Sequence, residues 1–244
     1  MNLRPIVAEF VGTAFLLAAV VGSGIMAQRL CGGNAGLALL ANALATGGAL
    51  VALILAFGPV SGAHFNPAVT LADAWQGGVA RSAVLPYVVA QIAGALCGTA
   101  LADGMFGLPP FFASGHARTG AGMLVSEFVA TFGLLAAIWG CARSRPAATP
   151  YAVAAYIVGA YWFTPSTSFA NPAVTVARSL TDTFAGIRPQ DVPAFVAVQL
   201  LGAFAATALF AWLSPISKTM AAAVVVPHSE GANAHGSIVS AARP

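Results

Sequence analysis

One pentapeptide occurs twice in the sequence: Asn66-Pro67-Ala68-Val69-Thr70 returns unchanged 105 positions later as Asn171-Pro172-Ala173-Val174-Thr175. Asn is among the preferred N-caps of helices, and Pro is favoured at the first helical position, where its missing N–H costs nothing. Each copy therefore predicts the start of a helix. The small alanine in third place would let the two helix starts approach each other closely.

Apolar runs occupy most of the rest of the chain. Of the 244 residues, 59% are hydrophobic and 7% are charged, whereas about a quarter of the residues are charged in a soluble domain. This length holds six spans of about 20 residues. Runs bounded by Gly, Pro and charged residues predict spans at about 6–27, 35–57, 84–105, 120–141, 150–164 and 192–213. The helices that begin at the two pentapeptides are too short to cross a bilayer, so we predict an all-α membrane protein.

The chain is also a repeat outside the pentapeptide. Two further pairs match in the same order, Glu9-Phe10-Val11-Gly12-Thr13 with Glu127-Phe128-Val129-Ala130-Thr131, and Gln91-Ile92-Ala93-Gly94-Ala95 with Gln199-Leu200-Leu201-Gly202-Ala203. They predict two repeats, about 1–108 and 119–216, in one domain, followed by a flexible tail at 217–244. Because three spans per repeat is an odd number, the second repeat must be inverted relative to the first. The two short helices then enter the membrane from opposite faces.

Two such half-helices meet near the midplane, and the segments leading into them are not helical. Non-helical backbone at that depth is tolerated only where it is buried in protein or lines a wet cavity. We therefore expect a water-filled path lined by the carbonyls of Gly62, Ala63, His64, Ser166 and Thr167. The facing helix N-termini carry partial positive charge and repel cations. The side-chain amides of the two capping asparagines would offer donors to a neutral solute that carries oxygen acceptors.

These motifs, within the span from Ile6 to Leu213, resemble the aquaporin and aquaglyceroporin family, whose signature is two Asn-Pro-Ala half-helices. The resemblance implies a homotetramer with a pore in each subunit, embedded in the lipid bilayer of the inner cell membrane. It also favours a structural role for Glu9 and Glu127 as acceptors for the loop N–H groups, over a proton relay. Separately, we expect the His64 side chain to brace its loop while its carbonyl lines the pore, rather than to act as a pH switch.

The second motif departs from the family at one position. Most members have Arg directly after the second Asn-Pro-Ala, and this sequence has Val174. Counting from the motifs places the other filter positions at Thr46, at Gly159 or Ala160, and at Ser168, none of them charged or aromatic. Bacterial members with Val at this position resemble channels associated with arsenic handling. The resemblance thus implies a passive, wide channel for water, glycerol-like polyols and neutral metalloid hydroxides such as arsenous acid.

Two other functions stay open at this stage. Arg178, one turn after Val174, would restore the filter of a water-selective channel if it reached the mouth, or it would pack against loop carbonyls. A pair between Asp73 and Arg178 is not expected, because the two lie on opposite faces. A secondary transporter also has inverted repeats, but it needs an ion site, and the spans offer little besides Glu9 and Glu127.

Other classes of function find no support in the sequence. It contains no nucleophile–base pair or paired carboxylates, and Cys31, Cys97 and Cys141 show no metal-ligand spacing. We therefore expect no enzyme, metal or cofactor, and the scattered basic residues indicate no nucleic-acid partner.

Basic residues predict the orientation of the chain, because they concentrate in cytoplasmic loops. With the N-terminus inside, six lie inside and three outside: Arg4, Arg81, Arg143, Arg145, Lys218 and Arg243 against Arg29, Arg118 and Arg188. This count places both termini in the cytoplasm.

Overall fold

The computed structural model describes residues 3–214, and within them all regular structure is helical. The α-helices are α1 (Leu3–Leu30), α2 (Ala35–Ser61), α3 (Pro67–Gln76), α4 (Arg81–Met105), α5 (Ala121–Ser144), α6 (Thr149–Phe163), α7 (Pro172–Arg178) and α8 (Val192–Leu213). The six predicted spans correspond to α1, α2, α4, α5, α6 and α8, and the all-α membrane fold is confirmed. The predicted tail at 217–244, which contains Lys218 and Arg243, lies outside the described residues.

Five of the helices, α1, α2, α4, α5 and α8, are long and apolar enough to cross a membrane. The sixth span, α6, has 15 residues and follows directly on a 3-10 turn, Pro146–Ala148. It ends at Phe163 because Thr164 precedes Pro165, and a residue before proline is pushed out of the helical region. Thr164 accordingly has extended backbone, with φ −116° and ψ 130°.

Two arginine contacts establish that the repeats are inverted. Arg29 donates to the carbonyl of Phe106, so α1 and α4 end on the same side of the molecule. Arg143, near the end of α5, donates to the carbonyl of Phe210 in α8 and to Gln76 at the end of α3. Since α4 begins just after α3, helices α5 and α8 end on the side where α4 begins. Each long helix therefore runs opposite to its equivalent in the other repeat.

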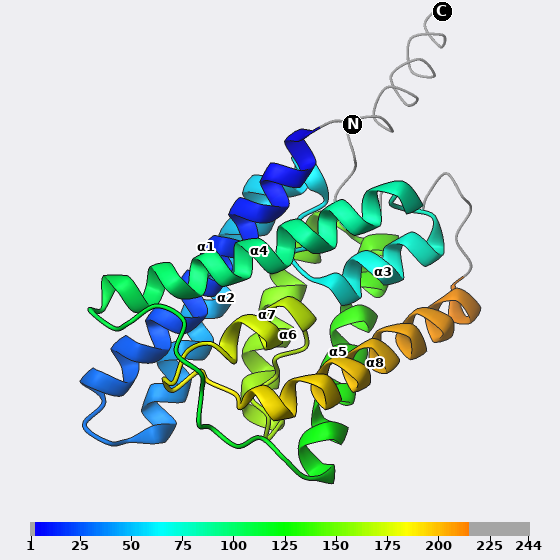
Figure 1. Ribbon diagram of the computed structural model, residues 1–244. Coiled ribbons are helices and arrows are strands. Elements are labelled where there is room, and N and C mark those ends of the chain that lie inside the picture. Colours follow the sequence, from blue (N-terminus) through cyan, green and yellow to red (C-terminus); the bar gives the residue numbers. More distant parts are fainter. Residues whose placement is uncertain (1–2, 215–244) are drawn as a thin grey trace, which may run out of the picture.

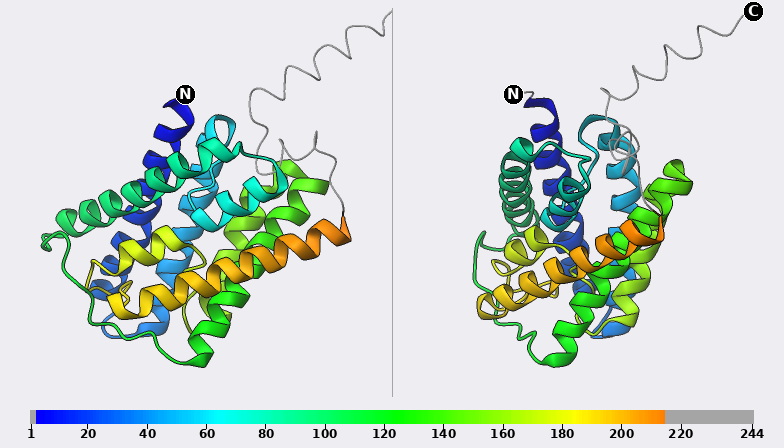
Figure 2. Two further views of the ribbon diagram at one scale, coloured as in Figure 1. Left: turned by 45° about the vertical axis from the view of Figure 1, so that its right-hand side comes forward. Right: turned by 90° about the vertical axis from the view of Figure 1, so that its right-hand side faces the viewer.

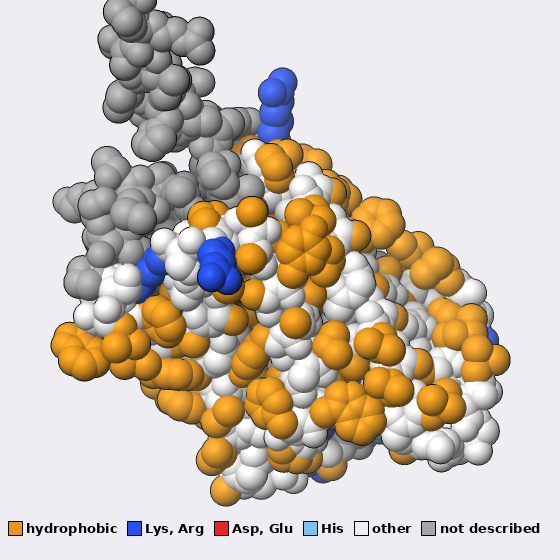
Figure 3. All heavy atoms as spheres, turned by 180° about the vertical axis from the view of Figure 1, so that it is seen from behind, with side chains coloured by type: hydrophobic (Ala, Val, Ile, Leu, Met, Phe, Trp, Pro, Cys, Tyr) orange, Lys and Arg blue, Asp and Glu red, His pale blue; other side chains and the backbone are white. Residues whose placement is uncertain are grey.

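The two half-helices are held in the middle of the molecule. Figure 1 shows α3 and α7 between α4 and α8, each of which contacts both half-helices. Figure 2 shows α1 and α5 on opposite sides of this centre, and α2 contacts α6 between the two repeats. Hydrophobic side chains are spread over the face shown in Figure 3, where few charged side chains are visible. Leu30, Leu85 and Trp212 are among the exposed large hydrophobic residues. Such a surface fits lipid rather than water.

Glycines set the close approach of α4 to α1 and of α8 to α5. A Cβ added at Gly98 would lie 2.0 Å from the carbonyl oxygen of Ala14, and one at Gly94 would lie 2.2 Å from that of Phe10. In the second repeat a Cβ at Gly202 would lie 2.5 Å from a backbone carbonyl of α5. Backbone atoms cannot move aside as a flexible side chain can, so these positions require glycine, as small residues do at many membrane helix interfaces.

Replacing Gly98 with alanine is expected to destabilise the fold. Overpacking of this kind costs about 1–3 kcal/mol, which corresponds to a melting temperature lower by roughly 2–12 °C for a chain of this size. Gly104→Ala on the same helix is the matched control, because a Cβ there meets nothing within 4 Å. Thermal unfolding in detergent, followed by size exclusion, measures both variants. Equal melting temperatures for the two variants would contradict the close approach of α1 and α4.

Candidate functional site

The half-helices begin at the two repeated asparagines, which cap them in the same way. The Asn66 side-chain oxygen accepts from the Ala68 N–H at 2.9 Å. The Asn171 side-chain oxygen accepts from the N–H groups of Ala173 at 2.9 Å and Val174 at 3.3 Å. Proline stands at the first helical position in both, where no intrahelical N–H bond is lost.

The same asparagines join the two repeats at the centre of the molecule. The Asn66 amide nitrogen donates to the carbonyl of Ala170 at 2.8 Å, and that of Asn171 donates to the carbonyl of Phe65 at 2.8 Å. Each amide has two N–H donors, so one is used in this cross-link. Helices α3 and α7 have 10 and 7 residues, together about 25 Å at 1.5 Å per residue. The second half-helix is shorter than the ten residues expected for each.

The backbone that leads into the half-helices is strained. Five residues other than glycine have φ between 48° and 63° there: Ala63 and Phe65 in the first repeat, and Thr167, Ser168 and Ala170 in the second. Residues with side chains rarely adopt this conformation, which costs about 1–3 kcal/mol each and persists only where the surroundings fix it. The strain marks the two loops as segments that the rest of the fold must hold.

Glu9 holds the first loop. Its carboxylate is fully buried and accepts from the N–H of His64 at 3.0 Å and of Phe65 at 2.7 Å. The Ser61 hydroxyl donates to it at 2.6 Å and the Gln91 amide at 2.8 Å. Four donors thus satisfy one carboxylate, as a buried charge requires.

Glu127 holds the second loop in the equivalent way. It accepts from the N–H of Phe169 and of Ala170, both at 2.9 Å. The Gln199 amide donates to Glu127 at 2.6 Å and also to the Thr175 hydroxyl at 2.8 Å. The two glutamines matched in the sequence repeat therefore connect each carboxylate to its half-helix.

The His64 side chain lies against the first half-helix. Its Nδ1 is 3.1 Å from the Thr70 hydroxyl, and its Nε2 is 3.6 Å from the Asp73 carboxylate. Asp73 is itself 1% exposed. These contacts from one helix to both ring nitrogens fix the orientation of the imidazole, as expected for a residue that braces its loop.

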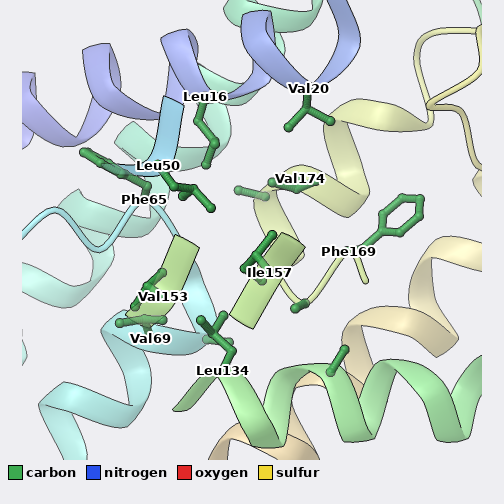
Figure 4. Packing of buried hydrophobic residues seen from close by; sticks show 14 of the residues in the cluster. Leu16, Val20, Leu50, Phe65, Val69, Leu134, Val153, Ile157, Phe169 and Val174 are labelled. Carbon is green, nitrogen blue, oxygen red and sulfur yellow. The ribbon is translucent and has the colours of Figure 1, made fainter. Parts of the chain in front are cut away.

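A cavity lies at the junction of the half-helices. Its volume, counted as the space open to the centres of water molecules, is ≈ 70 Å³. Its walls come from both repeats, and Figure 4 shows their aliphatic side chains directed toward a common space. The aliphatic lining from the six spanning helices consists of Leu16, Val20, Leu50, Ile54, Leu134, Ile138, Val153 and Ile157. Polar atoms reach it from the loops and half-helix starts, including the two asparagines.

The residues predicted for the filter divide into two groups. Thr46, Ser168 and Val174 line the cavity. Gly159 and Ala160 do not: Gly159 is exposed on the outer side, and Ala160 is buried with its carbonyl bound to Thr164.

The side chain that α6 contributes at this level is Tyr161, which the sequence reasoning missed. Tyr161 lines the cavity, and its hydroxyl is 3.2 Å from that of Thr46. Val153, Ile157 and Tyr161 recur every four residues and so share one helix face. That spacing is the signal in the sequence that identifies Tyr161. Tyr161 thus places an aromatic ring beside the predicted filter positions, none of which is itself aromatic.

Only some of the residues predicted to supply pore-lining carbonyls lie at the cavity. Ala63 and His64 line the cavity, whereas Gly62, Ser166 and Thr167 do not. Gly62 ends α2 in a left-handed conformation, and the carbonyl of Ser166 accepts from Arg118 at 2.9 Å. In the second repeat residues 168–171 line the cavity, later in the chain than the predicted Ser166 and Thr167. They are equivalent to residues 63–66 of the first repeat.

Two arginines lie beside the aromatic ring of Phe169. The Arg178 guanidinium carbon is 3.4 Å from the ring centroid and that of Arg118 is 4.8 Å from it. Arg118 also donates from Nε to the carbonyl of Gly186 at 2.8 Å. Burial lowers the pKa of the Arg118 guanidinium from its ordinary value, although a guanidinium stays charged in proteins. Arg178 lines the cavity, and, as expected, it makes no ion pair with Asp73 in the described part of the chain.

Comparison with known proteins agrees with this geometry. The model of the major intrinsic protein family matches residues 1–167. The aquaglyceroporin AqpS of Rhizobium meliloti (strain 1021) is 56% identical over 210 residues, which cover 86% of this chain and 90% of that protein. Aquaporin Z of Rhodopseudomonas palustris is 32% identical over 73% of this chain and 79% of its own length.

A solved structure has the same fold. The X-ray structure of the aquaglyceroporin from Plasmodium falciparum superposes with a TM-score of 0.59 at 20% sequence identity, covering 86% of this chain and 94% of that one. Two capped half-helices joined across inverted repeats, a family model matched over more than half of the chain, and a relative of 56% identity lead to one assignment. This chain belongs to the major intrinsic protein family.

Proposed function

We propose that this protein, a passive transmembrane channel for small uncharged solutes such as water and glycerol and not an enzyme, also conducts arsenous acid and related metalloid hydroxides. The aquaglyceroporin name of the relative at 56% identity supports the polyol part of this function. Arsenous acid is neutral at pH 7 and carries hydroxyl groups like a polyol. It therefore needs the same width and the same donors as glycerol.

The observation that carries the proposal is Val174 in the cavity wall. This side chain lies in the first turn of α7, where most of the family has arginine, and it lines the cavity at 5% exposure. A valine leaves the lumen wider than an arginine would and presents no strong donor at that point. Pore diameter and lining donors set the selectivity of such channels, so we place the filter at Thr46, Tyr161, Ser168 and Val174.

The rest of the lining suits an amphipathic solute. Part of the lining is aliphatic, from residues such as Leu50 and Ile157, and part consists of loop groups and the two asparagine amides. A polyol can turn its carbons to the aliphatic part and keep its hydroxyls hydrogen-bonded to the polar part. A small ion has no such face and would lose its hydration shell against the aliphatic part.

We place the channel in the inner cell membrane as a homotetramer, with residues 1–216 as one channel domain and both termini in the cytoplasm. The orientation is supported by where the arginines lie. Arg81 and Arg143 are on the side where α4 begins, and Arg29 and Arg118 are on the side where it ends. Because cytoplasmic loops carry the excess of basic residues, the first side would be the cytoplasmic one.

A second candidate, a water-selective channel, draws support from Tyr161 and Arg178. Both line the cavity, and together they supply the aromatic ring and the cation that Val174 does not. If these side chains closed the lumen to one water molecule, glycerol would be excluded.

Swelling of proteoliposomes in a stopped-flow instrument separates the two functions. The purified full-length chain is reconstituted and exposed to gradients of glycerol, of arsenous acid and of an impermeant osmolyte. The proposal predicts glycerol and arsenous acid fluxes at least about tenfold above those of empty liposomes, as expected for a pore wide enough for polyols. Rapid water flux with solute fluxes no faster than in empty liposomes would instead identify the water-selective channel.

A further inference from the structure

Arg178 is a buried cation in the wall of the cavity. It is the last residue of α7, one helical turn beyond Val174, and it is 2% exposed. Its side chain nevertheless lines the cavity. A guanidinium is always charged in proteins. The positive charge of Arg178 therefore acts on any solute in the cavity.

Two contacts hold the guanidinium against the wall of the cavity. Its carbon lies 3.4 Å from the centroid of the Phe169 ring, and its Nε donates to the carbonyl of Ala185 in the segment that follows α7. Phe169 is in turn fixed by an edge contact with Phe195, 5.5 Å between ring centroids, and by the bond from its N–H to Glu127. The same buried carboxylate that shapes the loop therefore also fixes the ring on which the guanidinium lies.

The charge of Arg178 has no directly paired counter-ion within residues 3–214, and the buried Glu127 carboxylate acts on it only from beyond ion-pair distance. Neither Arg178 nor Arg118 forms an ion pair with a carboxylate within residues 3–214. The two terminal nitrogens of Arg178 make no hydrogen bond to any residue in that range. Arg118 adds a second positive charge on the same ring, 4.8 Å from its centroid. Two guanidinium groups thus face the single buried carboxylate of Glu127, which leaves this end of the cavity with a net positive charge, and the free donors of Arg178 are available to a solute.

The equivalent position in the first repeat carries the opposite charge. Asp73 stands seven residues after Asn66, as Arg178 does after Asn171. Asp73 does not line the cavity, and its carboxylate lies 3.6 Å from the His64 ring. The positive charge in the wall is thus confined to the second repeat, at one end of the path.

We propose that Arg178 is the charge-selectivity residue of this channel. Held against the wall by Phe169, it repels cations across the lumen while leaving room for neutral polyols. In this chain, pore width and charge exclusion are then set by two residues one turn apart, Val174 and Arg178. This inference rests on the proposed function, because a pore wide enough for polyols is also wide enough for small organic cations, which must then be excluded by charge.

Urea and the guanidinium ion test the proposal, because they share size and shape and differ in charge. Fluxes of both are measured in proteoliposomes of the wild-type chain, Arg178→Gln and Arg178→Lys. Removing the charge should raise the guanidinium-to-urea flux ratio at least about tenfold in Arg178→Gln, whereas Arg178→Lys should keep the ratio low, because exclusion depends on the charge. Arg145→Gln is the matched control, since Arg145 is exposed at the end of α5, and it should leave the ratio unchanged.

A second variant tests the position of the guanidinium. Phe169→Leu removes the ring, so the Arg178 side chain is free to enter the lumen. We expect urea and glycerol fluxes to fall by about threefold or more while guanidinium stays excluded, because the charge is retained and the path is narrower. Unchanged solute fluxes in this variant would contradict the wall-bound arginine.

The outcomes distinguish the two proposals. If the wild-type chain passes neither urea nor glycerol faster than empty liposomes, the proposed function is wrong. If it passes urea and excludes guanidinium, and Arg178→Gln excludes guanidinium equally well, the channel function stands and the role of Arg178 is wrong. Water permeability, measured on the same vesicles, shows that each variant is folded and inserted.

Discussion

Val174→Arg is expected to lower the fluxes of glycerol and arsenous acid by at least about tenfold, while water flux falls by only about two- to threefold, because lumen diameter acts more strongly on the larger solute. Val174 lines the cavity directly after the second Asn-Pro-Ala motif. An arginine there would extend into a lumen bordered by Thr46 and Tyr161 and would present up to five N–H donors. A water molecule passes such a constriction in single file, whereas a three-carbon polyol does not.

Stopped-flow light scattering of one batch of vesicles gives all three fluxes, so differences in the amount of inserted protein cancel in the solute-to-water ratio. Val174→Thr is the control variant, since threonine has nearly the shape of valine and no charge. It should leave the ratio within about twofold of the wild-type value, because the diameter is unchanged and the hydroxyl adds one donor where an arginine adds up to five. A Val174→Arg variant in which water and glycerol fluxes fall in equal proportion would show that this position does not select solutes.

The second large effect is expected at Glu127. In Glu127→Leu the N–H groups of Phe169 and Ala170 and one amide donor of Gln199 lose their acceptor in a fully buried site. Each unsatisfied buried donor costs about 1–3 kcal/mol. The strained backbone of Ser168 and Ala170 also loses the contacts that fix it.

We therefore expect the melting temperature in detergent to fall by at least about 6 °C in Glu127→Leu, from three donors at about 1 kcal/mol or more each and about 2–4 °C per kcal/mol for a chain of this size. Glu127→Gln keeps one oxygen acceptor and should be intermediate. Asp182→Asn is the control, because Asp182 is an exposed carboxylate that also accepts a backbone N–H, that of Gly115. A melting temperature for Glu127→Leu within about 2 °C of the Asp182→Asn value would contradict the idea that this carboxylate holds the loop.

The positions of the helices follow from local properties of the sequence. Each span is an apolar run of the right length, and the two half-helices begin at an Asn-Pro pair that needs no tertiary contact to favour a helix start. The inversion of the repeats followed from an odd number of spans. The matched pairs also indicated the buried polar network, because Glu9 with Gln91 and Glu127 with Gln199 are the residues that the structure brings together.

The details of the lining depended on the three-dimensional path of the loops. Counting residues back from Asn171 assumes a loop of fixed geometry, and it selected Gly159 or Ala160. Pro165 and the left-handed residues that follow set another path, and the face of α6 that reaches the cavity carries Tyr161.

The sequence alone determined that this chain is an all-helical membrane protein of two inverted repeats with Val174 directly after the second motif. Only the tertiary structure decided where Arg178 lies. Its helix position allowed both the cavity and the outer loops. The choice came from two groups outside α7 that the flanking segments bring against its side chain, the Phe169 ring and the Ala185 carbonyl. Spacing along one helix fixes the direction of a side chain at its root, but contacts with the rest of the fold fix where a long side chain ends.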